Sequence, residues 1–244
     1  MLAVVLAGGF AKRLWPLTKD TPKPLLDVGG KPIIEHVMEK ILEIRDVDKV
    51  LVSTNKRFEK HFKDWLGKAE FNKPVKLITE PTVNENEKLG SIGGLKFLIE
   101  KERIDDNMLV VAGDNLFMFS LVGAYDFFKE RKVTVNALYD AKSIKVAREQ
   151  GTVLIDGNNR FISFEEKAEN PKSTLISLGI YFFPRGNVKL IPLYVEQGNN
   201  PDKMGYFIQW LMENYDVYGY IFQEKWFDIG WPESLEEARK EFGE

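Results

Sequence analysis

The chain begins with a run of apolar residues that ends in a glycine turn, and this start constrains the fold more than any other segment. Met1 to Leu6 shows no polar alternation, which is typical of a strand buried on both faces of a parallel sheet. Ala7, Gly8 and Gly9 follow, and glycine lets the backbone pass close to a ligand. Because the amides of such a turn can face an anion, the start predicts an α/β fold with an anion site after its first strand.

The same pattern of apolar, β-branched runs recurs along the chain, with helical patterns between the runs. The early runs are residues 1–7, 49–54, 75–79 and 108–114, and apolar stripes of helical spacing occupy 32–45 and 89–102. Later strands are expected at 133–140, 152–156, 161–166, 176–184 and 216–222, with helices at 206–214 and 232–242. Their short or irregular connections indicate a mixed sheet. We expect a Rossmann-like, mixed, mainly parallel sheet flanked by helices.

Length and composition narrow the class of protein. The 244 residues suit one large domain, and the net charge of −3 gives no basic field that would favour nucleic acid as a partner. There is no cysteine and there are only two histidines, so any metal site should use oxygen ligands. The first apolar run is too short for a signal peptide or a membrane span, which predicts a cytoplasmic location and no membrane partner.

Cations follow the glycine turn. Arg13 has planar donors suited to phosphoryl oxygens, Lys23 adds a point charge, and neighbouring prolines stiffen the loop that carries both. The order LAGG, Arg13, PLT, PKPLL, GGKP resembles the opening of the sugar-1-phosphate nucleotidylyltransferases, particularly the glucose-1-phosphate thymidylyltransferase and uridylyltransferase branch. The resemblance covers nearly the whole chain, with no segment for the left-handed β-helix domain that many relatives carry.

This resemblance implies a single nucleotidyltransferase domain over residues 1–244, with a nucleotide-binding part over about 1–130 and a sugar-binding part over about 131–244. It implies transfer of a nucleotidyl group from a nucleoside triphosphate to a sugar 1-phosphate with Mg²⁺, and release of pyrophosphate. dTTP or UTP with glucose 1-phosphate is the favoured pair, and GTP with mannose or heptose 1-phosphate is the variant. Relatives often assemble, so a homo-oligomer stays open.

The resemblance also assigns roles to individual residues. Arg13 and Lys23 are the expected catalytic cations. Asp114 in GDN and Asp228 in WFDIG are the expected magnesium ligands. Asp114 follows a predicted strand, and α/β sheets bind ligands at such strand ends. Nucleotide contacts are expected from Leu6, Ala7, Gly8, Gly9, Glu80, Gly90 and Ser91. Sugar-phosphate contacts are expected from Gly151, Glu166, Lys167, Gly179 and Tyr181.

Three positions depart from the family pattern. Ala11 replaces the second glycine of GxGxR and should fit if its φ is negative, and Ala168 replaces the proline after EEK. Trp231 replaces the usual threonine of DxGTP, and either packs over the sugar or base or is buried beneath the last helix. Two rival functions remain: a non-catalytic regulator that binds a nucleotide sugar, and a glycosyltransferase with metal aspartates.

Overall fold

The computed structural model describes residues 1–243, which divide into two compact units. The first unit comprises residues 1–88, 111–121 and the segment from 224 onward, and the second comprises 89–110 and 122–223. The chain therefore leaves the first unit twice and returns to it twice. This differs from the predicted division near residue 130, because the last helix belongs with the first strands and not with the second half.

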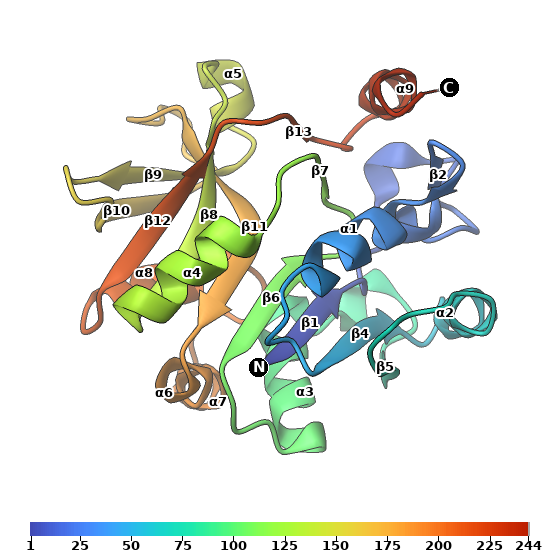
Figure 1. Ribbon diagram of the computed structural model, residues 1–244, viewed down its shortest axis with the longest axis horizontal. Coiled ribbons are helices and arrows are strands. Elements are labelled where there is room, and N and C mark those ends of the chain that lie inside the picture. The colour runs from blue at the N-terminus through green and yellow to red at the C-terminus, as the bar shows by residue number, and fades with distance from the viewer. Residues whose placement is uncertain (244) are drawn as a thin grey trace. The chain divides into compact units, whose positions relative to one another are not determined.

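The first unit is built on three parallel strands (Figure 1). Its elements are β1 (Leu2–Leu6), η1 (Lys12–Leu14), η2 (Lys23–Leu25), β2 (Asp27–Val28), β3 (Lys31–Pro32), α1 (Ile33–Leu42), β4 (Lys49–Asn55), α2 (Glu59–Leu66), β5 (Val75–Glu80), η3 (Glu85–Glu87), β7 (Leu116–Phe117), β13 (Trp226–Phe227) and α9 (Pro232–Glu241). β4 pairs with β1 on one side and β5 on the other. Their carboxyl ends therefore meet at one edge, where ligands bind in open α/β sheets.

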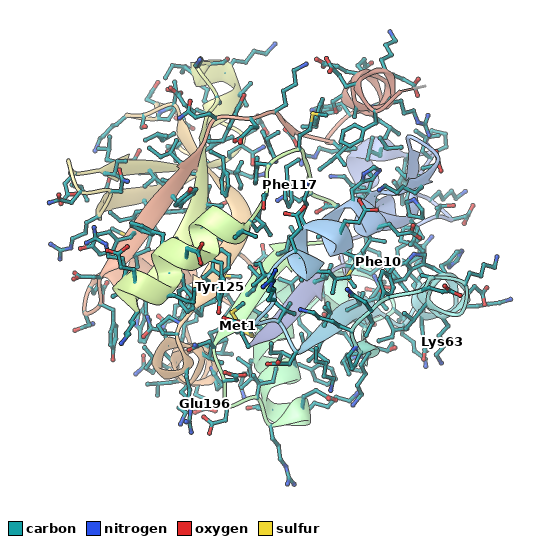
Figure 2. The ribbon with its side chains drawn as sticks, in the orientation of Figure 1. Met1, Phe10, Lys63, Phe117, Tyr125 and Glu196 are labelled. Atoms are coloured by element: carbon teal, nitrogen blue, oxygen red, sulfur yellow. The ribbon has the colours of Figure 1, made fainter. Side chains whose placement is uncertain are left out.

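Apolar faces hold the helices of this unit in place. Ile34, Met38 and Ile41 recur at helical spacing in α1 and are fully buried, as the sequence predicts. In α2, Phe62 is buried, whereas Lys63 points outward (Figure 2). α9 joins the same unit through a core cluster with η1, β7 and α1; its members are Leu14, Val28, Ile33, Leu116, Ile229, Leu235 and Ala238.

The second unit carries the antiparallel part of the fold. Its elements are α3 (Gly90–Glu102), α4 (Val122–Arg131), β8 (Thr134–Asp140), α5 (Ile144–Ala147), β9 (Gly151–Ile155), β10 (Phe161–Glu166), β11 (Leu175–Phe183), α6 (Arg185–Val188), α7 (Leu190–Glu196), α8 (Met204–Met212) and β12 (Val217–Phe222). β11 pairs antiparallel with β8 and β9, β9 with β10, and β12 runs parallel to β8. Figure 1 shows α4 lying across β8.

The unit boundary falls within β6 (Met108–Ala112). Parallel pairing in one unit and largely antiparallel pairing in the other confirm the predicted mixed sheet flanked by helices. Within residues 1–243, no helix combines the length and apolar character needed to cross a bilayer.

Candidate active site

The glycine turn after β1 is fixed by polar side chains at the end of β4. The Nδ2 of Asn55, a fully buried residue, donates to the Gly8 carbonyl at 3.0 Å, and Ala7 N donates to the Ser53 carbonyl at 2.8 Å. Leu6, the last residue of β1, accepts a bond from Gly113 N at 2.8 Å. Within residues 1–243 the amides of Gly8 and Gly9 donate no hydrogen bond, so both remain available to a ligand.

Ala11 continues the turn in the left-handed conformation. Its φ is 44° and its ψ is 45°, so the negative φ that would let alanine fit here without strain is not found. This conformation costs a residue with a Cβ about 1–2 kcal/mol. It is held because the Ala11 carbonyl accepts bonds from Leu14 N at 3.1 Å and from the buried Thr18 hydroxyl at 2.7 Å. The family's glycine would adopt this backbone without strain.

Arg13 lies exposed on η1, directly after this turn. Its guanidinium carbon is 5.5 Å from the centre of the Trp231 ring, and within the described part of the chain it forms no ion pair with a carboxylate. Trp231 is 51% exposed, so the alternative that it is buried beneath the last helix is wrong. The guanidinium donors of Arg13 thus stay open to an anion.

Lys23 pairs with Asp114. Its Nζ lies 2.9 Å from Oδ2, and the lysine side chain is only 12% exposed whereas the aspartate side chain is 42% exposed. Desolvation opposes ionisation of Asp114, but the Lys23 ammonium, with a smaller contribution from Arg13, outweighs it and lowers the pKa of the Asp114 carboxyl below its ordinary value. The predicted phosphate lysine and the predicted metal ligand are therefore direct neighbours.

Asp228 approaches the same place through a short antiparallel ladder. In this ladder Phe227 of β13 is opposite Leu116 of β7. Asp228 follows Phe227, and Asp114 and Asn115 precede Leu116, so both aspartates lie beyond the same end of this ladder. Since paired strands lie about 4.8 Å apart, the ladder brings both aspartates to one end of β7. No group of three or more His, Cys, Asp or Glu side chains forms a metal cluster within residues 1–243.

Glu80 ends β5 beside the glycine turn. The Ser53 hydroxyl donates to its Oε1 at 2.7 Å, and a Cβ added to Gly8 would lie 3.4 Å from the same oxygen. Glu80 is 7% exposed, and this burial raises the pKa of its carboxyl, against the opposing effect of the Ser53 hydrogen bond. Gly8 therefore keeps the backbone close to a buried carboxyl group.

Gly90 and Ser91, the other residues expected at the base, lie in the second unit at the start of α3. Gly90 has a φ of +76°, and a Cβ there would lie 2.4 Å from Asp202 Cα and 2.5 Å from the Pro201 carbonyl oxygen. The amides of Ser91 and the two residues after it donate to the carbonyls of Asp202 and Pro201, and the Ser91 hydroxyl donates to the Asp202 carbonyl. The glycine is thus required by packing within this unit, apart from any contact with a base.

Glu166 is the centre of the residues predicted to bind the sugar phosphate. Its side chain is 13% exposed, and its Oε1 lies 3.5 Å from Lys203 Nζ. A Cβ on Gly151 would lie 2.5 Å from the Phe164 ring and 3.4 Å from Glu166 Oε2, and a Cβ on Gly205 would lie 2.3 Å from that oxygen. Gly205, which was not predicted, therefore leaves space for the Glu166 carboxylate, and Gly151 leaves space for the Phe164 ring beside it.

Tyr181 and Gly179 lie on β11, where the pairing with β8 shifts register. Gly179 has a φ of +68° within this irregularity, which alanine would strain. The Tyr181 hydroxyl is 2.8 Å from the Ser177 hydroxyl, and burial, with the charge of Glu166, raises the pKa of Tyr181. Lys167, the residue after Glu166, is exposed and has a φ of +52°. Glu166 and Tyr181 are thus electrostatic neighbours within one unit.

The predicted site residues fall into two sets, one in each unit. The first set comprises Leu6, Ala7, Gly8, Gly9, Arg13, Lys23, Glu80, Asp114 and Asp228, and the second comprises Gly90, Ser91, Gly151, Glu166, Lys167, Gly179 and Tyr181. Sequence reasoning missed supporting residues in both sets: Thr18, Ser53, Asn55, Lys203 and Gly205. The polar run at the end of β4 was a usable signal, because strand ends bear ligand-site residues.

Similarity to known proteins identifies the family to which this chain belongs. A mixed α/β fold with a glycine turn after its first strand, followed by cations and two aspartates, is typical of α/β proteins that handle nucleotides. The family model "Nucleotidyl transferase" matches residues 2–244, and the chain belongs to that family.

Named relatives agree with this membership. The bifunctional protein GlmU of Methanocaldococcus jannaschii is 30% identical over 98% of this chain and 54% of its own length. Mannose-1-phosphate guanylyltransferase of Mycobacterium tuberculosis is 31% identical over 96% of this chain and 62% of its own. The chain thus spans between half and two thirds of these relatives.

A solved structure from Bacillus anthracis, assigned as a glucose-1-phosphate thymidylyltransferase and bound to sucrose, superposes with a TM-score of 0.84. Its sequence is 25% identical, and the match covers 99% of this chain and 95% of that one. This similarity confirms the predicted fold class.

Proposed function

We propose that this protein transfers a nucleotidyl group from a nucleoside triphosphate to a sugar 1-phosphate. A phosphate oxygen of the sugar phosphate attacks the α-phosphorus in line, the bond between the α-phosphorus and its bridging oxygen to the β-phosphorus breaks, and pyrophosphate leaves. The reaction needs no protein nucleophile, so the protein contributes positioning and charge. dTTP or UTP with glucose 1-phosphate is the proposed pair.

The observation that carries this proposal is the exposed guanidinium of Arg13 in the first unit, close in sequence to open backbone amides. Arg13 is exposed and has no carboxylate partner within residues 1–243, and it follows a turn whose Gly8 and Gly9 amides are open. An exposed guanidinium without a carboxylate partner, in the loop that follows open amides, is suited to the phosphates of a nucleotide.

The two aspartates fit a divalent cation. Asp114 and Asp228 reach one end of β7 and offer carboxylate oxygens, which Mg²⁺ prefers, and one or two protein carboxylates are usual for it beside substrate phosphates and water. When bound, Mg²⁺ supplies positive charge to the phosphate oxygens. Lys23 already places a positive charge beside Asp114, which supports a role for this carboxylate in cation binding.

The second unit offers groups for the sugar phosphate. Glu166 is a largely buried acceptor for hydroxyl groups, and positive charge comes from Lys203, which pairs with it, and from Lys167, the next residue in the chain. Tyr181, Gly151 and Gly179 shape the surroundings of Glu166. This supports a polyhydroxy, anionic second substrate.

The test is release of pyrophosphate across a panel of the five common triphosphates and several sugar 1-phosphates, with Mg²⁺ present. We expect one pair to dominate, and Arg13→Met to reduce its turnover about a hundredfold to a thousandfold. Absence of turnover with every pair would contradict the enzyme proposal and favour a nucleotide-sugar sensor. Hydrolysis of a nucleotide sugar without pyrophosphate formation would favour a glycosyltransferase.

GTP with mannose 1-phosphate is a second candidate pair. The similarity to a mannose-1-phosphate guanylyltransferase supports it. Glu80 also supports it, because an ionised carboxylate only accepts hydrogen bonds and guanine presents two adjacent donors on its pairing edge. The triphosphate panel separates the two pairs directly.

A further inference from the structure

Trp231 contacts Arg13 of the candidate site, and neither the family pattern nor packing in the core explains a tryptophan at this position. Its ring is 51% exposed, although tryptophan is normally well buried, and it lies at the N-terminal cap of α9. The Arg13 guanidinium carbon lies over this ring at 5.5 Å from its centre. A large apolar ring left in solvent, with a cation on its face, requires a reason.

We propose that Trp231 is a positioning residue that holds the Arg13 guanidinium ready for the triphosphate. The proposal rests on the function proposed above. An aromatic face attracts and orients a cation without neutralising its charge or occupying its hydrogen-bond donors, which lie in the guanidinium plane. A carboxylate in the same place would orient the guanidinium but would compete with phosphate for it.

The charges around Arg13 support this choice of partner. Lys12, the preceding residue, pairs with Glu85, and Lys23 pairs with Asp114. Arg13 forms no ion pair within residues 1–243, contacts the Trp231 ring and acts on Asp114 only as a weaker charge than Lys23. The arrangement therefore leaves the guanidinium without a carboxylate bound to it at the open glycine turn.

The backbone segments that carry Arg13 and Trp231 are anchored by the same buried apolar cluster. Leu14, next to Arg13, and Leu235, one turn into α9, are buried in one cluster. The Trp231 backbone is held by Ser234, whose hydroxyl donates to the Trp231 carbonyl at 2.9 Å. On the other side, the Thr18 hydroxyl holds the Ala11 carbonyl. The ring and the guanidinium therefore do not depend on each other for their backbone positions, and loss of the ring should free only the side chain.

The kinetic test compares three variants. Trp231→Leu should lower kcat/KM for the preferred triphosphate about two- to fivefold, since exposed cation–π contacts have about that effect on an equilibrium. Trp231→Phe should recover most of the loss, because phenyl also offers a ring face. Trp15→Leu is the matched control: Trp15 is 47% exposed, lies two residues from Arg13, and should change nothing.

A double-mutant cycle separates positioning from a structural role. In an Arg13→Met background, Trp231→Leu should have no further effect, because the side chain it positions is gone. If Trp231→Leu lowers kcat/KM by the same factor in the wild-type and Arg13→Met backgrounds, the proposal is overturned. Equal activity of wild type and Trp231→Leu would also overturn it. Melting temperatures of all variants confirm that folded proteins are compared.

A binding measurement keeps this inference separate from the proposed reaction. Titration of the full chain with inorganic triphosphate should change the tryptophan emission of wild type and Trp15→Leu, and not that of Trp231→Phe or Arg13→Met. If no substrate pair turns over but this signal is found, the enzyme proposal fails and the positioning role stands. If turnover is found and the signal is the same in wild type and Trp231→Phe, only the positioning role fails.

Discussion

Lys23 Nζ lies 2.9 Å from Asp114 Oδ2, and the buried partner of this pair is the lysine. The two residues are 91 positions apart, and the two roles proposed for them are contact with phosphate for Lys23 and binding of a divalent cation for Asp114. Their pairing means that the positive charge of Lys23 is balanced while the carboxylate remains accessible. Binding of a cation at Asp114 would shift this balance and leave the Lys23 ammonium for phosphate.

Asp114→Asn should reduce turnover about a hundredfold to a thousandfold, even at saturating Mg²⁺, because a ligand charge is lost while the volume is kept. It should also destabilise the protein by about 1–2 kcal/mol, since Lys23 would be left mostly buried without its carboxylate. Pyrophosphate release and urea unfolding measure the two effects. Asp105→Asn, which removes an exposed carboxylate paired with Arg185 and Lys189, is the control and should keep full activity.

Glu80→Gln should make stability less sensitive to a rise in pH above the ordinary glutamate pKa. Burial raises the pKa of Glu80, so the folded state holds a proton where the unfolded state has lost it, and stability falls as pH rises through the folded-state pKa. Glutamine keeps an acceptor for the Ser53 hydroxyl and removes the charge. We expect the variant to melt about 2–4 °C above wild type at pH 8, and not at pH 4, as for a change of about 1 kcal/mol.

Glu59→Gln is the control of opposite sign for this experiment. Lys56 and Lys63 lower the pKa of Glu59 to about 2, so its contribution is present above the ordinary glutamate pKa and is lost in acid. The variant should therefore be no more stable than wild type at pH 8. An identical response of both variants to pH would refute the assignment to burial.

Gly90→Ala should destabilise the second unit by about 2–4 kcal/mol. The left-handed backbone disfavours any residue with a Cβ, and a Cβ added at Gly90 would lie only 2.4 Å from Asp202 Cα. Gly186→Ala, in a helix with open space at the added Cβ, is the matched control and should leave stability unchanged or raise it slightly. Chemical denaturation followed by circular dichroism provides the comparison, and equal midpoints for the two variants would contradict the packing role.

Ala11→Gly should stabilise the protein by about 1 kcal/mol, because a residue with φ 44° loses its steric strain when the Cβ is removed. Alanine-to-glycine replacement elsewhere has the opposite effect, so Ala69→Gly should destabilise. Differential scanning calorimetry of the pair is sufficient. A loss of stability in both variants would show that the backbone at Ala11 relaxes to another conformation.

Regular elements with a clear apolar pattern could be predicted from the sequence. β1, β4, β5 and α1 begin and end within a few residues of their predicted bounds, because burial on one or two faces leaves a periodic pattern. α4 was missed: Gly123 and several aromatic residues within Val122–Arg131 hide its helical period. Tertiary packing of α4 against β8 forms this helix in the absence of a strong local signal.

Candidate site residues could be named from the sequence, but the contacts that bring them together could not be predicted from it. Resemblance pointed to Asp114 and Asp228, but the ladder that unites them has two residues in each strand and pairs positions more than a hundred apart. No local pattern encodes such a pairing. Similarly, the backbone of Ala11 depends on the buried Thr18 hydroxyl, and the positive φ of Gly90 depends on Pro201 and Asp202, all contacts between distant or irregular segments.

The return of the chain to the first unit at residue 224 has a consequence for biosynthesis. Asp228, Trp231 and the core residues of α9 emerge from the ribosome after the whole second unit, so β1 and the glycine turn must wait for more than two hundred residues before their unit is complete. Units made of continuous segments can fold as they emerge, whereas this one can only close after the second unit has been made. Any nascent or prematurely ended chain that stops before residue 224 would lack one of the two aspartates.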